Sequence, residues 1–174
     1  MLTRLRLERF KSFEDAELSL EPFTLLVGAN ASGKSSVREA LRFLHAAGRG
    51  YNLAEIFGGK WSGGERPWEG LRGGVREASF RRAESFAMEV EADEISNGQP
   101  GTARGAVVVT RYRAGVETIA TRPPSMAEEA LWAGARGEDL RAVYEASTQQ
   151  QASQQTSVQR ARHRGDRGPG ARRP

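Results

Sequence analysis

The sequence lacks several ingredients of common functional sites. Its 174 residues include no cysteine, which excludes disulfides, a thiolate zinc site and a cysteine nucleophile. Histidine occurs only at His45 and His163, so a histidine-rich metal site is also excluded. No apolar run reaches the ~18 residues of a membrane span, and charges interrupt the N-terminus too often for a secretory signal peptide. We therefore expect a cytoplasmic protein without a membrane span.

Lysine is scarce as well, since only Lys11, Lys34 and Lys60 occur among 26 basic residues. The formal net charge is +4, but residues 158–174 hold six arginines and one aspartate and contribute +5. That leaves −1 for residues 1–157. The basic character therefore belongs to the C-terminal tail and does not indicate a basic binding face on the rest of the chain.

The N-terminal region shows the most regular hydrophobic pattern. Leu5 and Leu7 alternate with charged residues, and residues 16–20 alternate in the same way. This period of two predicts two half-buried strands, joined through residues 10–13. Two aromatic residues in that connection, Phe10 and Phe13, are expected to pack in the core between these strands.

The next stretch changes from a strand pattern to a helix pattern. Residues 23–27 form a nearly continuous apolar run ending at Gly28, which predicts a central parallel strand buried on both faces. From Ser35 onwards, apolar residues recur at helical spacing as far as a C-cap at Gly48. The sequence therefore predicts a strand, a glycine loop and an amphipathic helix in succession.

The second half of the chain gives weaker signals. Residues 85–113 contain two alternating apolar stretches around Asn97-Gly98, which predicts an antiparallel hairpin. A capping-box pattern beginning at Ser125 predicts a short helix over residues 125–132, and a second short helix is expected over residues 140–144. The final segment is rich in glutamine and arginine and poor in apolar residues, which predicts a disordered tail.

The glycine loop carries the clearest chemical signal. It fits G-x-x-x-x-G-K-[ST], the phosphate-binding P-loop, with a predicted strand before it and a predicted helix after it. Its amides would form a nest for an anion, reinforced by the positive end of the helix. The candidate nucleotide-binding residues are Gly28, Ala29, Asn30, Ala31, Ser32, Gly33, Lys34, Ser35 and Ser36. Lys34 would reach the β- and γ-phosphates, and the Ser35 hydroxyl would ligate Mg²⁺.

Together with the two preceding strands, this loop resembles the N-terminal lobe of the RecF/SMC/OLD-like ATPases, P-loop enzymes of the AAA family within the ABC superfamily. The resemblance implies an α/β fold, ATP and Mg²⁺ as cofactors, and DNA-related work in repair or phage defence. It also implies a possible homodimer of ATPase heads in the intact protein. By the same resemblance, Lys11 and Ser12 lie near the adenine or ribose. Ala31 stands where many members have glycine.

The resemblance also implies three elements that this sequence does not clearly contain. Residues 90–94 end in Asp-Glu, but the preceding residues alternate with glutamate and predict a half-exposed strand instead of a Walker B element. Residues 61–65 resemble a signature loop in composition but come too soon after Lys34, and we interpret them as a turn. A glutamine that senses Mg²⁺ is also doubtful. The simplest interpretation is a truncated or frameshifted N-terminal half with negligible ATP hydrolysis, and the catalytic residues stay unknown.

The expected organisation has three parts: a P-loop ATPase lobe over residues 1–92, a hairpin with short helices over 93–146, and the disordered tail over 147–174. Two alternatives to the ATPase function follow from other features. A small GTPase would need an Asn/Thr-Lys-x-Asp motif, and no lysine is followed by x-Asp. A nucleic-acid binder without enzymatic activity could use the arginine-rich tail through counterion release.

Overall fold

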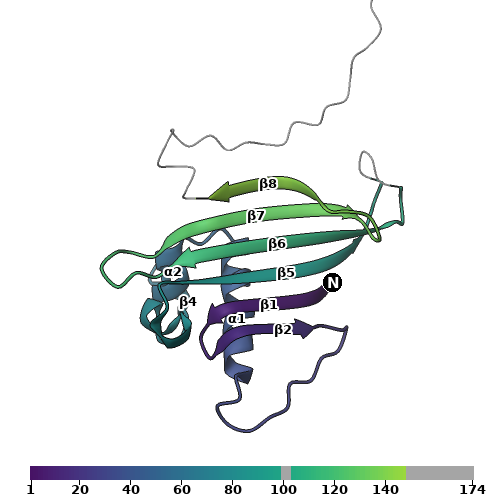
Figure 1. Ribbon diagram of the computed structural model, residues 1–174. Helices are drawn as coiled ribbons and strands as arrows, with labels where there is room; N and C mark the ends of the chain where they lie inside the picture. Colours follow the sequence, from purple (N-terminus) through teal and green to yellow (C-terminus); the bar gives the residue numbers. More distant parts are fainter. Residues whose placement is uncertain (99–102, 148–174) are drawn as a thin grey trace, which may run out of the picture.

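A six-stranded antiparallel sheet forms the frame of the computed structural model, which describes residues 1–98 and 103–147. The strand order is β2-β1-β5-β6-β7-β8, so β5 adds to the N-terminal pair and the later strands follow in sequence (Figure 1). The strands are β1 (Leu2–Phe10), β2 (Phe13–Ser19), β5 (Ser85–Ile95), β6 (Val107–Glu117), β7 (Ser125–Ala135) and β8 (Arg141–Ser147).

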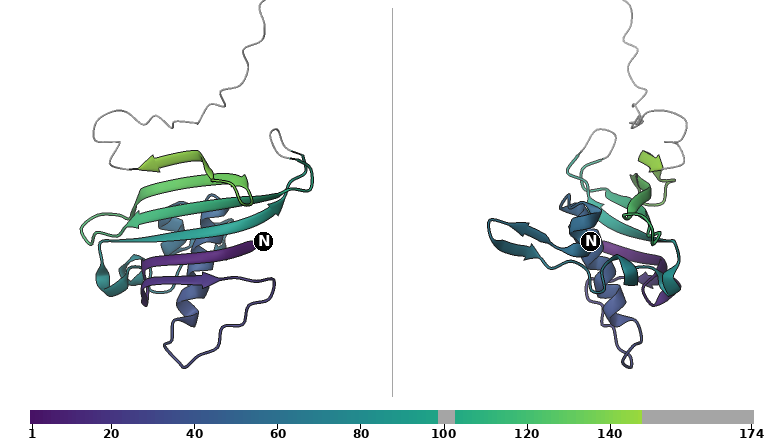
Figure 2. Two further views of the ribbon diagram at one scale, coloured as in Figure 1. Left: turned by 45° about the vertical axis from the view of Figure 1, so that its right-hand side comes forward. Right: turned by 90° about the vertical axis from the view of Figure 1, so that its left-hand side faces the viewer.

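The segment between β2 and β5 supplies the helices. Helix α1 (Lys34–Gly48) lies across one face of the sheet, behind β1, β2 and β5 in Figure 1. Helix α2 (Leu53–Gly58) follows, capped by reciprocal bonds between Asn52 and Glu55. A hairpin of β3 (Lys60–Ser62) and β4 (Glu65–Trp68) projects away from the sheet (Figure 2). Two short 3-10 helices, Val75–Glu77 and Phe80–Arg82, then lead into β5.

The hydrophobic core lies between the helices and this face of the sheet. The ring of Phe43, on α1, meets Phe86 of β5 edge-on with centroids 5.8 Å apart, and Phe57 of α2 joins the same cluster. Burying such aromatic side chains stabilises the fold by roughly 1.5–3 kcal/mol each. The largest fully buried side chains are Phe10, Phe43, Phe86, Leu5, Leu7, Ile56, Met88 and Val116.

Charged side chains of opposite sign cover the other face of the sheet. Arg113 on β6 donates to Glu8 on β1 at 2.8 Å and to Glu128 on β7 at 2.6 Å. The hydrogen bond from Arg113 lowers the pKa of Glu8 below its usual value, although partial burial opposes the shift. The pair with Glu8 spans the intervening strand β5, whereas the pair with Glu128 joins the neighbouring strands β6 and β7, and both support the register of the sheet.

The two alternating strands and the helix predicted in the N-terminal region are confirmed, with Leu5 and Leu7 fully buried on β1. The predicted C-cap is one residue too early, because Gly48 is the last residue of α1 and Arg49 is its C-cap. Phe10 is also fully buried, whereas Phe13 packs against the edge of the core. The predicted hairpin over residues 85–113 is confirmed as the antiparallel pair β5–β6. The predicted division after residue 92 falls inside β5. Of the tail predicted over residues 147–174, Ser147 is the last residue of β8, and the rest lies outside the described residues.

The two short helices predicted near the C-terminal end are wrong. Residues 125–132 belong to β7, and residues 141–144 belong to β8, which Leu140 directly precedes. The Ser125 hydroxyl bonds across the sheet to Glu117 instead of capping a helix, and Tyr112 donates to Glu129 of β7 at 2.7 Å. Pairing with β6 therefore outweighs the local capping signal.

The central parallel strand predicted over residues 23–27 is also absent from the described structure, where these residues form an irregular, exposed segment. Phe23 is 83% exposed, Leu25 72% and Val27 82%. A strand buried on both faces needs hydrogen-bonded neighbours on both edges, and no described segment pairs with this one. The sequence contains the apolar run, but the structure does not bury it.

No helix in the part of the chain that the structure describes is long and apolar enough to cross a membrane. Within the same residues, no group of three or more His, Asp or Glu side chains is arranged to hold a metal ion.

Candidate nucleotide site

The P-loop connects the exposed segment to the first turn of α1. Gly33 is the N-cap of the helix and has φ +94°, a left-handed conformation that glycine adopts without strain. Ala31 also has a left-handed conformation, with φ +66°, which costs a residue with a side chain roughly 1–2 kcal/mol. The loop therefore uses glycine at one of its two left-handed positions and alanine at the other.

A second reason for glycine at position 33 is its contact with Phe13. A Cβ atom placed on Gly33 would lie 2.5 Å from the Phe13 ring, far inside van der Waals contact. The sequence predicted Phe13 as a core residue, but the structure shows that it also supports the P-loop. Gly28 is restricted in the same way, because its Cβ would lie 2.7 Å from the Ser32 hydroxyl.

The ammonium group of Lys34 lies inside the curve of the loop. It donates to the carbonyl oxygens of Gly28 and Ala29, both at 2.6 Å, and to the Ser32 hydroxyl at 3.2 Å. These bonds fold the side chain back over the loop and put its positive charge where the motif predicts a phosphate.

The start of α1 supplies further donors. The amides that precede Ser36 have no carbonyl one turn earlier within the helix to bond with, whereas those of Ser36 and Val37 bond to the Gly33 carbonyl. No acidic residue in the first turn neutralises the positive end of the helix. The Ser35 side chain is exposed at this end, whereas Ser36 is buried and accepts a hydrogen bond from the Ser12 hydroxyl at 3.0 Å. Ser12 is thereby tied to the helix start.

These groups line a pocket of about 470 Å³. Its lining combines Ser12, the loop and helix residues Asn30, Ala31, Ser32, Gly33, Lys34, Ser35 and Ser36, and one more distant residue, Arg72. Sequence analysis missed Arg72, because it lies in a glycine-rich stretch with no motif of its own. The lining contains cationic and hydroxyl groups and no carboxylate.

Lys11 takes a different position from its neighbour Ser12. Its ammonium group donates to the Arg72 backbone carbonyl and does not line the pocket. Burial lowers the pKa of Lys11, and the negative charges of Glu39 and Glu77 partly offset that effect. In this structure Lys11 therefore contacts the segment that carries Arg72, while Ser12 lies at the pocket wall.

The residues present fit the polyphosphate of a nucleotide and its Mg²⁺. Lys34 and Arg72 supply positive charge, the helix end supplies amide donors, and Ser35 presents an exposed hydroxyl as a possible metal ligand. Ser12 and Asn30 could contact other parts of the same ligand from the pocket wall. The site is thus suited to binding an anion.

The sequence also suggested an acidic pair, Asp93 and Glu94, which the structure places far from this pocket. Asp93 forms backbone hydrogen bonds with Met1 and an ion pair with Arg136. Met1 precedes β1 and Ser12 follows it, so the acidic pair and the pocket lie at opposite ends of this strand, roughly 25 Å apart. Residues 61–65 form the tip of the β3–β4 hairpin, as the interpretation of a turn predicts.

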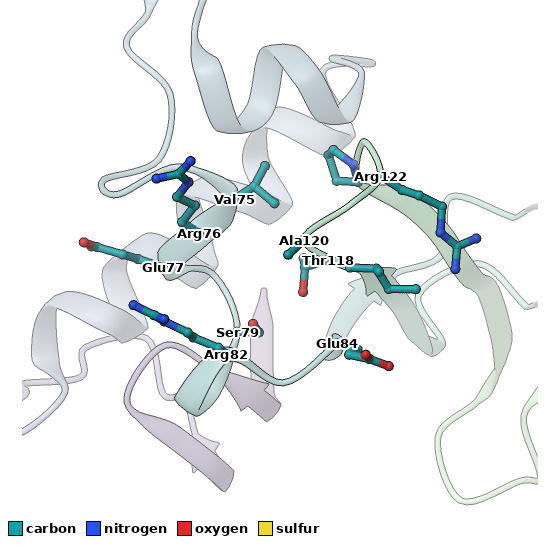
Figure 3. A pocket seen from close by; sticks show the side chains of 11 residues that line it. Val75, Arg76, Glu77, Ser79, Arg82, Glu84, Thr118, Ala120 and Arg122 are labelled. Atoms are coloured by element: carbon teal, nitrogen blue, oxygen red, sulfur yellow. The ribbon is translucent and has the colours of Figure 1, made fainter.

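A larger hollow, of about 730 Å³, lies between the two 3-10 helices and the β6–β7 connection. Figure 3 shows that the charged ends of Arg76, Arg82 and Arg122 spread away from one another instead of converging on a ligand. Smaller side chains, among them Ser79 and Ala120, face its centre. The convergence of donors therefore favours the P-loop pocket as the candidate site.

Comparison with known families agrees with this geometry. The sequence model of the AAA ATPase domain matches residues 1–99, which is more than half of the chain and includes the P-loop and β5. The chain belongs to the AAA ATPase domain family. The resemblance to AAA-family P-loop ATPases that the sequence suggested is confirmed by this match, as is the mixed α/β fold class.

Curated relatives are similar to part of this chain. The DNA replication and repair protein RecF of Pectobacterium atrosepticum is 36% identical over 93 residues, covering 53% of this chain and 25% of the relative. RecF of Cronobacter sakazakii is 48% identical over 56 residues, covering 32% of this chain and 15% of the relative. The chain thus spans about 15–25% of the length of these relatives.

A solved structure described as "Structural biochemistry of ATP-driven dimerization and DNA stimulated activation of SMC ATPases" is also similar. It is 22% identical to this chain, with a TM-score of 0.41, and the match covers 78% of this chain and 70% of the other.

Proposed function

We propose that this chain binds Mg-ATP at the P-loop pocket and is the ATP-binding portion of a RecF-like ATPase. The observation that carries the proposal is the convergence of Lys34, Arg72 and the amide-rich start of α1 on one pocket without a carboxylate. A pocket with this lining attracts a polyphosphate and has no negative charge to repel it. Membership in the AAA ATPase domain family supports the same ligand.

ATP hydrolysis by this chain alone is expected to be negligible. Phosphoryl transfer to water needs a group that orients the water and a carboxylate that helps to hold Mg²⁺. No carboxylate lines the P-loop pocket among the described residues, and Asp93 and Glu94 lie at the far end of β1. Turnover that depends on Lys34 in the purified chain would contradict this expectation.

Coupling of ATP to DNA-related work, in repair or in phage defence, is proposed for the intact protein. Support comes from the family resemblance and from the relatives named as DNA replication and repair proteins. A homodimer of ATPase heads belongs to the same proposal and rests on the resemblance of the sequence. DNA binding that requires ATP and is lost in Lys34→Ala would support it. Salt-sensitive DNA binding lost on deletion of residues 158–174 would favour the arginine-rich tail instead.

The affinity of the chain for a fluorescent Mg-ATP analogue tests the proposal directly. Lys34→Ala should weaken binding about 10- to 100-fold, because a charge-assisted hydrogen bond to phosphate contributes about 1.5–3 kcal/mol. Lys60→Ala is the matched control, since Lys60 lies on the β3–β4 hairpin and pairs with Glu55. Equal affinity in wild type and Lys34→Ala would refute the assignment of the P-loop.

A further inference from the structure

Glu39 is a buried carboxylate that the P-loop motif does not include. It lies on α1, one turn beyond the P-loop residues, and is only 2% exposed. Such a charge needs partners, because leaving water without them costs several kcal/mol. Its two oxygens have separate partners: one accepts from the Arg42 guanidinium at 3.1 Å, and the other accepts from the backbone N–H of Arg72 at 3.0 Å.

Arg42 extends this contact to the beginning of the same segment. Its second terminal nitrogen donates to the carbonyl of Gly70 at 3.1 Å, and its guanidinium lies 4.7 Å from the centroid of the Trp68 ring. Gly70 has φ +83°, and a Cβ there would lie 2.6 Å from the Phe57 carbonyl oxygen. Residues 70–72 are therefore held at both ends by two side chains from α1.

Lys11 holds the segment from the opposite side. It comes from the β1–β2 connection and donates to the Arg72 carbonyl, so both backbone polar groups of Arg72 are bonded to charged side chains. Arg72 itself lines the P-loop pocket. A glycine-rich stretch, which has little intrinsic order, thus presents a cation to the pocket through bonds made by its backbone.

We propose that Glu39 is a positioning residue for the nucleotide site: it fixes residues 70–72 to α1 and thereby holds the Arg72 guanidinium at the wall of the P-loop pocket. The inference deepens the proposed function and rests on nucleotide binding there. It assigns Glu39 no contact with the ligand, since Glu39 does not line the pocket. The carboxylate acts through the backbone of another residue, so its removal should affect binding only while Arg72 carries its side chain.

The first test is hydrogen exchange of the free chain, measured by NMR at the Arg72 amide. Glu39→Gln keeps the size of the side chain but removes its charge, and exchange at this amide should become at least about tenfold faster, as loss of a charge-assisted bond predicts. Glu138→Gln, at an exposed position between β7 and β8, is the matched control and should change nothing. Unchanged exchange in Glu39→Gln would overturn the proposal without any ligand being present.

The second test is a double-mutant cycle on the affinity for Mg-ATP. Glu39→Gln should weaken binding about five- to tenfold in the wild-type background and have no further effect in Arg72→Ala. Equal weakening in both backgrounds would show a general structural role and overturn the proposal. If the wild-type chain does not bind Mg-ATP, the proposed function fails, while the exchange experiment still decides whether Glu39 holds the segment.

A second variant covers the case in which Glu39→Gln does not fold. Arg42→Gln changes a side chain that is 32% exposed and removes the charged donor to the Gly70 carbonyl. It should also accelerate exchange across residues 70–72 and weaken Mg-ATP binding in the same direction. Normal exchange and normal affinity in Arg42→Gln would contradict the proposed arrangement.

Discussion

The two segments that flank the P-loop differ completely in burial, although both were predicted to be buried. On the helix side, Val37 and Phe43 are at most 4% exposed, whereas on the strand side Phe23 and Val27 are more than 80% exposed. Both segments carry large apolar side chains, so the presence of such side chains does not distinguish them. What differs is where their backbone groups find hydrogen-bond partners.

A helix satisfies its own backbone groups, so α1 needs only one apolar surface to pack against, and the sheet provides it. A strand needs neighbouring strands on both edges before its side chains can be covered. Residues 23–27 have no such neighbours among the described residues. An apolar segment with open edges of this kind favours aggregation.

Truncating one phenylalanine on each side gives the largest expected difference. Phe43→Ala should lower the free energy of unfolding by about 3–5 kcal/mol, because it leaves a cavity between α1 and the sheet. Phe23→Ala should change it by less than about 0.5 kcal/mol, since the ring is 83% exposed. Urea denaturation of both variants measures the contrast. A loss above about 2 kcal/mol in Phe23→Ala would mean that residues 23–27 are buried after all.

Substitution of the glycines at the two ends of α1 tests whether the P-loop has the described backbone conformation at Gly33. Gly33→Ala should destabilise the chain by about 1–3 kcal/mol, because it forces a side chain into a left-handed conformation against Phe13. Gly48→Ala should be neutral or stabilising by up to about 1 kcal/mol, since a Cβ there meets open space. Thermal unfolding compares the two, and similar effects would contradict the described P-loop geometry.

The ion pairs on the charged face of the sheet make the free energy of unfolding depend on pH. Because Arg113 lowers the pKa of Glu8 in the folded chain, the stabilisation is present above pH 4.5, the ordinary value, and is lost as the pH falls through the lowered pKa. Glu8→Gln should therefore lose about 1 kcal/mol or less at pH 7 and show a shallower decline in acid. Denaturation curves from pH 7 to about 3 measure this slope, with exposed Glu14→Gln as the control. Identical acid profiles for Glu8→Gln and the wild type would rule out the stabilising pair.

The smallest expected effect concerns alanine in the loop. Ala31→Gly should raise the free energy of unfolding by a few tenths of a kcal/mol, because relief at φ +66° slightly exceeds the entropic cost of glycine. Ala29→Gly is the matched control and should lower stability slightly, as it gains flexibility without relieving a left-handed angle. Denaturation of both variants measures this contrast, and a free energy of unfolding that falls in Ala31→Gly as it does in Ala29→Gly would contradict the strain at Ala31.

Local patterns were sufficient where one segment determines its own structure. The alternation of Leu5 and Leu7 located β1, and the spacing from Ser35 located α1. The P-loop motif is likewise contiguous, and its glycines and Lys34 could be recognised in the sequence, while its role as a nucleotide site stays a prediction. In each case the information lies within a few residues of the feature that it specifies.

Prediction failed where distant segments decide the structure. Residues 125–132 carry a helix-capping pattern, but bonds to β6 make them a strand. Arg72 lines the P-loop pocket, and its backbone is bonded to Glu39 and Lys11, which belong to elements far away in the sequence. Single-sequence periodicity contains no information on such contacts.

Titration of the isotopically labelled chain with Mg-ATP, followed by amide chemical shifts, tests the central claim most directly. We expect saturable shifts at residues 28–36, with Ser12 and Arg72 responding and core amides such as Phe43 unaffected. The same titration of Lys34→Ala should show much weaker binding. The account would be contradicted if the P-loop amides did not respond, or if their response survived unchanged in Lys34→Ala.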